Sequence, residues 1–437
     1  MKILIAAAGS YGDIAPYTGL AARLRAAGHV VALAADPSYD SLLRSADLCP
    51  IPLPADPRSA GGAAVGRASA GGSAAGRGGG DVSGSGNRAL MRAAAGFVRT
   101  LGTSLARAVA EADPEMLLLS TTTAPLGRQL SEALGIPALG VALQPAHPTG
   151  DFPPPVSGAR SLGKRGNHLA GRAAQRVVDR LYADAVRALR TELGLPHTSA
   201  TAIRRARAAT VMPVLHGFST ALVPCPADWP AELKVVGNWW PFVPSGARLP
   251  DRLADFLASG PPPVLIGFGS MGAGHGERLG RTAVRALRRA GVRGVLQAGW
   301  AGLSADDEPP GDDMLTIGNV PHALLLPHLA AVVHHAGAGT TAAALRAGLP
   351  SVPVPVTADQ PFWAARLVAA GAGTAPLPFA ALAANGAEER LAAAVGRAVR
   401  DASLRARAEA AARHMETEDG AGAVLAAVEE TPLVGGV

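Results

Sequence analysis

Short runs of apolar residues, each followed by small residues and then by a helical pattern, occur in two series along the chain. The first series opens at residues 2–8, Lys-Ile-Leu-Ile-Ala-Ala-Ala, and the second opens at residues 263–268, Pro-Val-Leu-Ile-Gly-Phe. Strands that are buried on both faces of a parallel sheet give such uninterrupted apolar runs. The pattern therefore predicts an α/β fold, built twice, in which strands alternate with helices.

The two series supply the elements of two expected domains. In the first we expect strands at 2–8, 30–34, 116–120 and 137–141, and helices at 16–27, 124–134 and 172–193. In the second we expect strands that begin at 263, 294, 332 and 351, and a helix at 278–290. The resulting boundaries are an N-terminal domain at 1–228, a Pro-, Gly- and Trp-rich linker at 229–262, a C-terminal domain at 263–415 and a helical end at 416–437.

Residues 57–87 form a different kind of segment, because Gly, Ala, Ser and Arg dominate it and no apolar period is present. Such a segment buries too little apolar surface to offset the entropy lost on ordering. We expect a mobile low-complexity loop in the first domain. Two interpretations stay open for it, a lid over a site and a tolerated insertion.

Composition limits the class of protein. With 437 residues, of which 48% are apolar, the chain is long enough for two cores. The longest uncharged stretches contain His, Pro and Gly, so we expect no stable membrane insertion. We interpret residues 1–8 as a strand and not as a signal peptide, because no small-residue cleavage pattern follows. Cys49 and Cys225 lack metal spacing, which fits a reducing cytoplasm.

The net charge of +6 suits anionic substrates, but a nucleic-acid partner is not expected. The densest basic cluster, at 204–207, has no interleaved aromatic residue, and aromatics make up only 4% of the chain, which leaves no base-stacking surface. Acidic residues at 306–308 and 312–313 lie beside a Pro-Pro-Gly turn. They indicate an exposed loop rather than a metal site.

The segment 334–341, His-His-Ala-Gly-Ala-Gly-Thr-Thr, carries the most specific chemistry. An apolar run precedes it and a helix-forming run follows it, so it predicts a strand, a glycine-rich turn and a helix N-terminus. Backbone N–H groups there lack intrahelical acceptors, and the helix dipole adds partial positive charge. We therefore expect a nucleotide diphosphate at this turn.

Five motifs occur in order, at 9–16, 267–271, 320–322, 334–341 and 359–363. Together they resemble the GT-B family 1 glycosyltransferases, and within these the bacterial natural-product and sterol glucosyltransferase branch. The resemblance extends over nearly the whole chain. It implies two Rossmann-like domains whose parallel sheets face a central cleft, with the helix of 416–437 packed back on the N-terminal domain.

The resemblance also implies the two catalytic residues. Asp13 would act as the general base on the acceptor hydroxyl, with Ser10 orienting Asp13 or the acceptor, and His335 would contact the diphosphate of the donor. The alternative for Asp13 is a helix cap near Ile14, because Asp is a preferred N-cap residue. His334 is expected to point to the opposite face of its strand and to be structural.

The remaining candidate residues fall into three groups. The nucleotide and diphosphate group comprises Ser270, Trp300, Val320, Gly337, Ala338, Gly339 and Thr340. The sugar-binding pair is Asp359 and Gln360, in which the carboxylate accepts hydrogen bonds and the amide both donates and accepts, as a fully hydroxylated hexose requires. Loops after the N-terminal strands supply the acceptor side, with Ser10, Gln144, His147 and Phe152.

Some positions depart from the family pattern. Tyr11 replaces an arginine, Ala336 replaces a glycine, and residues 323–324 replace an Asp-Trp pair. Ala343 stands where plant relatives carry a ribose-binding glutamate. Uridine and thymidine diphosphate sugars therefore both remain possible donors.

The resulting hypothesis is an inverting, metal-independent glycosyltransferase that moves a hexose from a UDP- or TDP-sugar to a small hydrophobic acceptor. The nucleotide sugar is a co-substrate, no cofactor is expected, and the protein would be a cytoplasmic monomer or weak dimer. Three alternatives stay open: a catalytically silent binding partner of another transferase, a sugar-nucleotide epimerase on the same scaffold, and a nicotinamide-dependent dehydrogenase. The last lacks Gly-x-Gly-x-x-Gly followed by a ribose-binding acid.

Overall fold

The computed structural model describes residues 1–55, 84–196, 212–269, 276–299, 302–305 and 311–432. The chain divides into two compact units. The first unit comprises Met1–Thr220, Pro224–Pro244 and Glu418–Val437, and the second comprises Ala221–Val223 and Ser245–Thr417. The chain therefore builds most of the first unit, then the second, and returns to the first for its last helix.

A seven-stranded parallel sheet forms the centre of the first unit. Its strands are β1 (Lys2–Ala6), β2 (Val30–Ala35), β3 (Cys49–Pro52), β4 (Met116–Leu119), β5 (Ala138–Ala142), β6 (Val214–His216) and β7 (Leu233–Val235). Their order is β3-β2-β1-β4-β5-β6-β7. The strand order changes direction between β1 and β4, and open parallel sheets bind ligands at the carboxyl ends of the strands at such a point.

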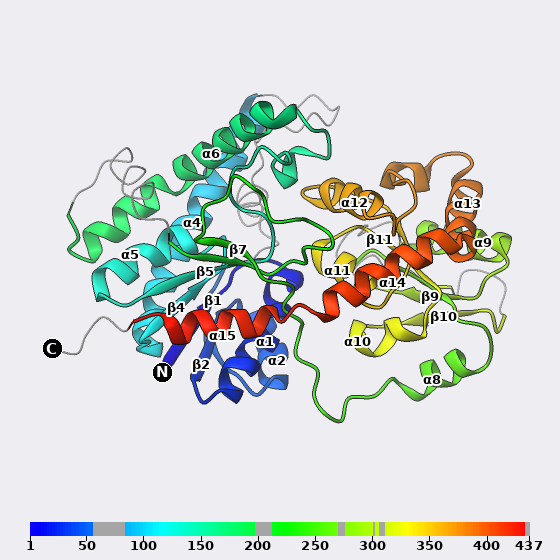
Figure 1. Cartoon of the computed structure of the whole chain (residues 1–437), viewed down its shortest axis with the longest axis horizontal. Coiled ribbons are helices and arrows are strands. Elements are labelled where there is room, and N and C mark those ends of the chain that lie inside the picture. The colour runs from blue at the N-terminus through cyan, green and yellow to red at the C-terminus, as the bar shows by residue number, and fades with distance from the viewer. Residues whose placement is uncertain (56–83, 197–211, 270–275, 300–301, 306–310, 433–437) are drawn as a thin grey trace. The chain divides into compact units, whose positions relative to one another are not determined.

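Helices cover both faces of this sheet (Figure 1). One face packs against α1 (Tyr11–Ala26), α2 (Asp40–Ser45) and α15 (Gly420–Glu430), and the opposite face packs against α4 (Gly84–Ala112), α5 (Ala124–Leu134) and α6 (Gly163–Glu192). Along β1, Ile3 and Ile5 enter the first core while Leu4 and Ala6 enter the second, as the two-residue period of a strand requires.

The second unit is built around a five-stranded parallel sheet. Its strands are β8 (Val264–Gly267), β9 (Gly294–Gln297), β10 (Met314–Ile317), β11 (Ala331–His334) and β12 (Ser351–Pro353), in the order β10-β9-β8-β11-β12. One face packs against α9 (Gly276–Ala290) and α13 (Ala387–Arg400), and the other packs against α8 (Asp251–Ala258), α10 (His322–Leu325) and α11 (Ala338–Arg346). Two further helices are α12 (Gln360–Ala369) and α14 (Ala402–Glu416).

Two parallel sheets with helices on both faces confirm the expected α/β fold class. The helix starts were less well predicted. α1 begins at Tyr11 rather than at Pro16, because Ser10 caps it and the proline is accommodated inside the helix. α6 begins at Gly163 rather than at residue 172.

The stretch 229–262, which the sequence suggests is a linker, contributes residues to both units. β7 extends the first sheet, and the Trp239 indole lies in its core and donates from Nε1 to the Gly420 carbonyl at 3.1 Å. α8 packs Leu253 into the second unit. Of the expected loop at 57–87, residues 57–83 lie outside the described residues, and the rest begin α4. None of the described helices combines the length and apolar character needed to cross a membrane.

Candidate active site

Asp13 lies in the first turn of α1, just after the carboxyl end of β1. Its Oδ2 atom accepts two hydrogen bonds from Ser10, from the backbone N–H at 2.7 Å and from the hydroxyl at 2.8 Å. Within the described part of the chain, Oδ1 has no hydrogen-bond donor. Burial raises the pKa of the Asp13 carboxyl, and the two hydrogen bonds from Ser10 partly oppose that rise.

This geometry corrects the capping alternative. The N-cap of α1 is Ser10, and Asp13 is the third helical residue, whose carboxylate closes a capping box with the Ser10 backbone. Gly9 makes the arrangement possible, because a Cβ atom there would lie 2.5 Å from the Asp13 Oδ2 atom. The motif therefore fixes one carboxylate oxygen and leaves the other open.

The two neighbouring histidines of the second unit have different environments at the end of β11. His334 is fully buried, and its Nδ1 accepts a hydrogen bond from the Ala336 backbone N–H at 3.1 Å. The His335 ring lies between two glycines, since a Cβ atom would come within 3.2 Å of the ring at Gly269 and within 2.6 Å at Gly337. Burial, with a smaller effect of His322, lowers the pKa of His335 to about 4, so its imidazole is neutral at pH 7.

The glycine-rich turn leads directly into a helix N-terminus. Gly337 is the N-cap of α11, and the first intrahelical bond runs from the Thr341 N–H to the Gly337 carbonyl at 2.9 Å. The N–H groups of Ala338, Gly339 and Thr340 therefore precede the hydrogen-bonded ladder. Gly339 is exposed, and a Cβ atom there would meet nothing within 4 Å. The arrangement suits an anion.

The predicted sugar-binding pair caps the next helix. Asp359 is the N-cap of α12, and its Oδ2 accepts a hydrogen bond from the Trp363 indole at 2.7 Å. Gln360 is buried, and its Oε1 accepts hydrogen bonds from the backbone N–H groups of Val356 and Thr357 at 2.8 and 3.0 Å. The expectation that the amide both donates and accepts toward a sugar is therefore wrong for Gln360, because only its NH2 group remains for a ligand.

The other nucleotide-site predictions have different outcomes. The Val320 side chain is buried in an apolar core of the second unit. Ser270 and Trp300 lie outside the described residues.

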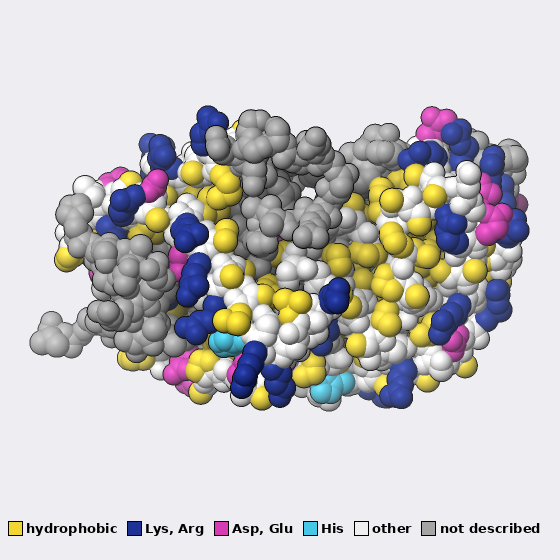
Figure 2. All heavy atoms as spheres, turned by 90° about the horizontal axis from the view of Figure 1, so that it is seen from above, with side chains coloured by type: hydrophobic (Ala, Val, Ile, Leu, Met, Phe, Trp, Pro, Cys, Tyr) yellow, Lys and Arg dark blue, Asp and Glu magenta, His cyan; other side chains and the backbone are white. Residues whose placement is uncertain are grey.

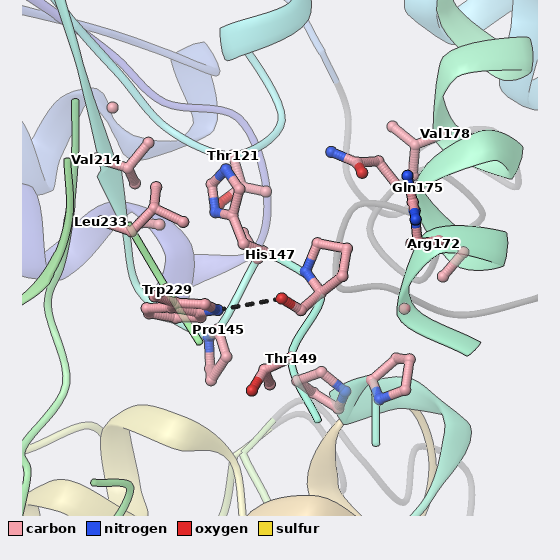
Figure 3. A pocket seen from close by; sticks show the side chains of 18 of the residues that line it. Thr121, Pro145, His147, Thr149, Arg172, Gln175, Val178, Val214, Trp229 and Leu233 are labelled. Atoms are coloured by element: carbon pink, nitrogen blue, oxygen red, sulfur yellow. Dashed lines mark hydrogen bonds between the residues drawn. The ribbon is translucent and has the colours of Figure 1, made fainter. Parts of the chain in front are cut away.

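A cavity of about 800 Å³ lies inside the first unit, between the sheet and α6 (Figure 3). Among the predicted acceptor residues, His147 and Phe152 line it, whereas Ser10 and Gln144 do not. Trp229 forms part of one wall, and its Nε1 donates to the Pro148 carbonyl at 3.3 Å.

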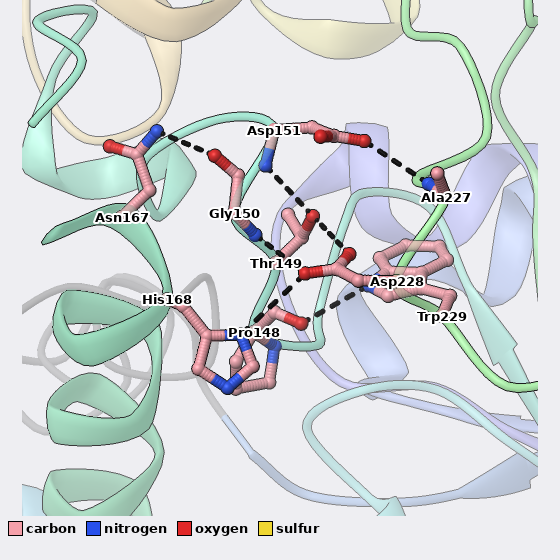
Figure 4. Close-up of polar contacts among 9 residues, drawn as sticks. All are labelled: Pro148, Thr149, Gly150, Asp151, Asn167, His168, Ala227, Asp228 and Trp229. Atoms are coloured by element: carbon pink, nitrogen blue, oxygen red, sulfur yellow. Dashed lines mark hydrogen bonds and ion pairs between the residues drawn. The ribbon is translucent and has the colours of Figure 1, made fainter. Parts of the chain in front are cut away.

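A carboxylate holds the wall of the cavity in place (Figure 4). Asp228 accepts hydrogen bonds from the Thr149 hydroxyl at 2.6 Å and from the Gly150 backbone N–H at 2.7 Å, and it lies 3.6 Å from the His168 Nδ1. These contacts tie the loop after β5 to the segment before β7. The hydrogen bonds outweigh partial burial and lower the pKa of Asp228.

Comparisons with known proteins identify the family of this chain. Residues 307–430 match the family described as "Erythromycin biosynthesis protein CIII-like, C-terminal domain". The O-mycaminosyltylonolide 6-deoxyallosyltransferase of Streptomyces fradiae is 34% identical over 98% of this chain and 97% of its own length. Glycosyltransferase GtfE of Amycolatopsis orientalis is 32% identical over 99% of this chain and 100% of its own. The chain belongs to the family 1 glycosyltransferases.

Further relatives include a sterol glucosyltransferase and a structurally similar antibiotic glycosyltransferase. A sterol 3-beta-glucosyltransferase of Arabidopsis thaliana is 32% identical over 99% of the chain, which spans 66% of that protein's length. The crystal structure of the calicheamicin glycosyltransferase has a TM-score of 0.68 at 18% identity, covering 98% of each chain, and establishes the GT-B fold. The protein is a nucleotide-sugar-dependent glycosyltransferase.

Sequence reasoning missed the helix side of the cavity in this glycosyltransferase. Arg172, Gln175 and Val178 of α6 point toward the cavity, opposite His147 and Trp229 (Figure 3). The apolar stripe of this helix was interpreted only as core. The signal that identifies the cavity side is polar, because Arg172, Gln175 and Asp179 recur at helical spacing beside that stripe.

Proposed function

We propose that this glycosyltransferase transfers a hexose from a UDP- or TDP-sugar to a hydroxyl of a small hydrophobic natural product, with inversion and without a metal ion. The observation that carries the proposal is the Asp13 carboxylate, which Ser10 holds through one oxygen while the other stays open at the carboxyl end of β1. A general base needs this combination of fixed position and a free lone pair.

The chemistry proposed for Asp13 is direct. Its carboxylate takes the proton of the acceptor hydroxyl while that oxygen attacks the anomeric carbon of the donor and the bond from that carbon to the diphosphate breaks. A single displacement of this kind inverts the anomeric configuration. Burial raises the pKa of Asp13 above its ordinary value, which makes the carboxylate a stronger base than an exposed aspartate.

The second unit supplies groups for the leaving nucleotide. The N–H groups at the start of α11 and the neutral His335 imidazole are hydrogen-bond donors held in place before the reaction. Negative charge grows on the diphosphate as the sugar departs, and fixed donors stabilise that charge most strongly in the transition state. This donor set supports departure of the diphosphate without a metal ion.

The cavity of the first unit supports a hydrophobic acceptor. Its volume of about 800 Å³ falls in the range of sites that enclose drug-sized ligands. β5, whose end lines the cavity, is two strands from β1, which is about 10 Å at the usual strand spacing. Tyr17 of α1 bridges that interval, since its hydroxyl donates to the Val141 carbonyl at 2.6 Å. The proposal requires an acceptor in the cavity to extend along the carboxyl ends of β5, β4 and β1 toward Asp13.

Relatives support the same choice of substrates. The names of relatives include a vancomycin aglycone glucosyltransferase and a sterol 3-beta-glucosyltransferase, so an antibiotic aglycone and a sterol are among the acceptors that these names state. Two solved relatives, SsfS6 and the spinosyn rhamnosyltransferase SpnG, hold thymidine diphosphate, and SpnG also has a complex with its aglycone. We therefore infer a nucleotide sugar and a small acceptor as the partners of this chain.

The proposal is tested by finding a donor and then removing the base. UDP- and TDP-hexoses are screened by thermal shift, and the best donor is offered with a panel of hydrophobic acceptors in the presence of a chelator. Mass spectrometry detects a gain of one hexose, and NMR of the product reports the anomeric configuration.

The Asp13→Asn variant decides the role of the base. Asn retains an oxygen that accepts the Ser10 hydrogen bonds, so the fold and the donor-induced thermal shift should be unchanged. We expect kcat to fall by about 100-fold to 10,000-fold, the usual contribution of a general base. Turnover at the wild-type rate would contradict the proposal, and so would a product of retained configuration.

A further inference from the structure

The cavity of the first unit has charged residues concentrated on its α5 and α6 side. Among the described residues, the charged and titratable ones that line it, apart from His147, are Arg128, His168, Arg172, Arg176, Asp179 and Asp228. Four of these six lie on α6 between residues 168 and 179. The opposite wall is largely apolar, so the cavity has two chemically different sides.

The acidic groups of this lining already have partners. Asp228 is held by Thr149, Gly150 and His168, and both Asp179 and Arg128 take part in further polar interactions. In the part of the chain that the structure describes, no hydrogen bond or ion pair engages Arg172 or Arg176. Two guanidinium groups at helical spacing therefore remain for a ligand.

Neighbouring arginines on α6 offer a comparison. Arg165 and Arg180 are exposed like Arg172 and Arg176, but they do not line the cavity. In the view from above, Lys and Arg side chains are scattered among hydrophobic ones on the surface of the molecule (Figure 2). The two pairs carry the same charge, but only Arg172 and Arg176 line the cavity.

The wall opposite α6 carries an aromatic stack. Trp229 stacks on His216 with ring centroids 4.5 Å apart and an interplanar angle of 28°, and the His147 ring meets both edge-on. Burial lowers the pKa of His216 to about 3, so this stack carries no charge from His216 at neutral pH. Aromatic ligands pack against such a surface in stacked or edge-on geometry.

We propose that the acceptor is an aromatic molecule that carries an acidic group, and that Arg172 and Arg176 bind this group while Trp229 packs against the ring system. The inference rests on the proposed function and narrows its acceptor class. A guanidinium presents a planar fork of N–H donors that matches a carboxylate, and charged hydrogen bonds of this kind are the stronger ones. Both arginines are exposed, so they favour an acidic acceptor without excluding a neutral one.

The test compares an acid with its uncharged ester. Isothermal titration calorimetry measures the binding of 6-hydroxy-2-naphthoic acid and of methyl 6-hydroxy-2-naphthoate to the full chain, at low and at high salt. We expect the acid to bind about tenfold more tightly than the ester at low salt, the sum of two exposed ion pairs. High salt should remove most of that preference because it screens exposed charges.

Two double variants test whether Arg172 and Arg176 cause the preference for the acid over the ester. The double variant Arg172→Gln, Arg176→Gln should bind the acid about tenfold more weakly than the wild type does, and its affinity for the ester should be unchanged. Arg165→Gln with Arg180→Gln makes the same change of charge away from the cavity, and should alter the affinity for the acid less than twofold. Equal effects of the two double variants would overturn the proposal, and so would equal affinities for acid and ester or no binding of either probe.

The readout is binding, so it is independent of turnover. Failure to transfer a hexose to any acceptor would contradict the proposed function, even if the acid bound as expected. Transfer of a hexose to the ester, without any preference for the acid, would leave the proposed function intact and overturn this inference alone.

Discussion

At the scale of single residues, two glycines of the first motif have different tasks. A side chain on Gly9 would collide with the Asp13 carboxylate, whereas a Cβ atom on Gly12 meets only the Ser10 hydroxyl, at 3.9 Å. The absence of a side chain at Gly9 therefore allows the Asp13 carboxylate to take its position. Gly12 occupies an ordinary helical position in the first turn of α1.

The Gly9→Ala variant should lose activity through displacement of Asp13. We expect kcat to fall by about 100-fold, the effect of a misplacement near 1 Å. Gly12→Ala is the matched control, and it should retain activity and gain about 0.5–1 kcal/mol in the free energy of unfolding, since alanine is the better helix former. Steady-state kinetics and urea unfolding measure both variants. Comparable losses of kcat in the two would contradict this account.

Gln360 separates a structural function from a binding function within one side chain. Its oxygen holds the backbone of Val356 and Thr357, so only the amide nitrogen is available for a sugar hydroxyl. Gln360→Glu keeps the oxygen acceptor and removes the donor. We expect an unchanged melting temperature and a KM for the nucleotide sugar that rises about tenfold, the loss of one or two hydrogen bonds.

The control for this variant is the nucleotide diphosphate without its sugar. The Kd of that ligand should be the same for wild type and Gln360→Glu, because the changed group lies at the predicted sugar site. A parallel loss of affinity for the free nucleotide diphosphate would show that the substitution disturbs the whole donor site.

Sequence motifs located these residues but did not define their geometry. The aspartate of the first motif was expected after the first strand, and the structure places it there. Its position within the helix was wrong, because Pro16 suggested a later start than the one that Ser10 caps. The commitment of the Gln360 oxygen to Val356 depends on how a loop folds back, which residue types alone do not reveal.

At the scale of elements, the cavity depends on a clamp between two loops. Asp228 precedes β7 and accepts hydrogen bonds from Thr149 and Gly150 in the loop after β5. Asp151 adds a return contact by accepting a hydrogen bond from the Ala227 N–H at 3.1 Å. Two segments far apart in sequence therefore form one wall (Figure 4).

The Asp228→Ala variant should loosen that wall. Gly150 is buried, and its N–H would lose its acceptor, so we expect the free energy of unfolding to fall by about 1–2 kcal/mol. The KM for the acceptor should rise while the KM for the donor stays the same. Asp184→Ala on the exposed side of α6 is the control and should change stability by less than about 0.5 kcal/mol. Equal changes in both KM values would argue against a role confined to the cavity.

Element prediction succeeded where the apolar period was strong and failed where it was short. The strands that were recognised from continuous apolar runs are β1, β2, β4, β5, β8, β9, β11 and β12, whereas β3, β6 and β10 were not predicted. The first turns of α6 were missed because Gly163, Lys164 and Gly166 show no apolar period. β7 has only three residues, and its place in the sheet depends on pairing with β6, so it was assigned to a linker.

At the scale of the whole molecule, buried neutral histidines contribute to the response to acid. Burial lowers the pKa of His216 and of His334 to about 3, and that of His335 to about 4, from the ordinary value of 6.5. Below pH 6.5 the unfolded chain binds protons at these positions and the folded chain does not. The stability that these groups contribute is therefore complete above pH 6.5 and falls as the pH falls toward 4.

Urea unfolding across the range from about pH 7 to pH 4 tests this expectation. Each of the three histidines should contribute a slope of about 1.4 kcal/mol per pH unit. His216→Phe keeps an aromatic ring against Trp229 and removes one titrating group. It should therefore lower the slope of unfolding free energy against pH by about 1.4 kcal/mol per pH unit. His414→Gln, an exposed control, should leave the slope unchanged. A slope that is insensitive to His216→Phe would contradict the assignment.

The return of the chain to its first unit has a consequence for biosynthesis. α15 places Val424 and Val428 in the same core as Ile3 and Ile5 of β1. During translation, β1 emerges more than 400 residues before these partners in α15. The first unit must therefore keep an apolar strip of its surface uncovered until α15 has been synthesised. Chaperone capture of nascent chains should accordingly centre on that strip.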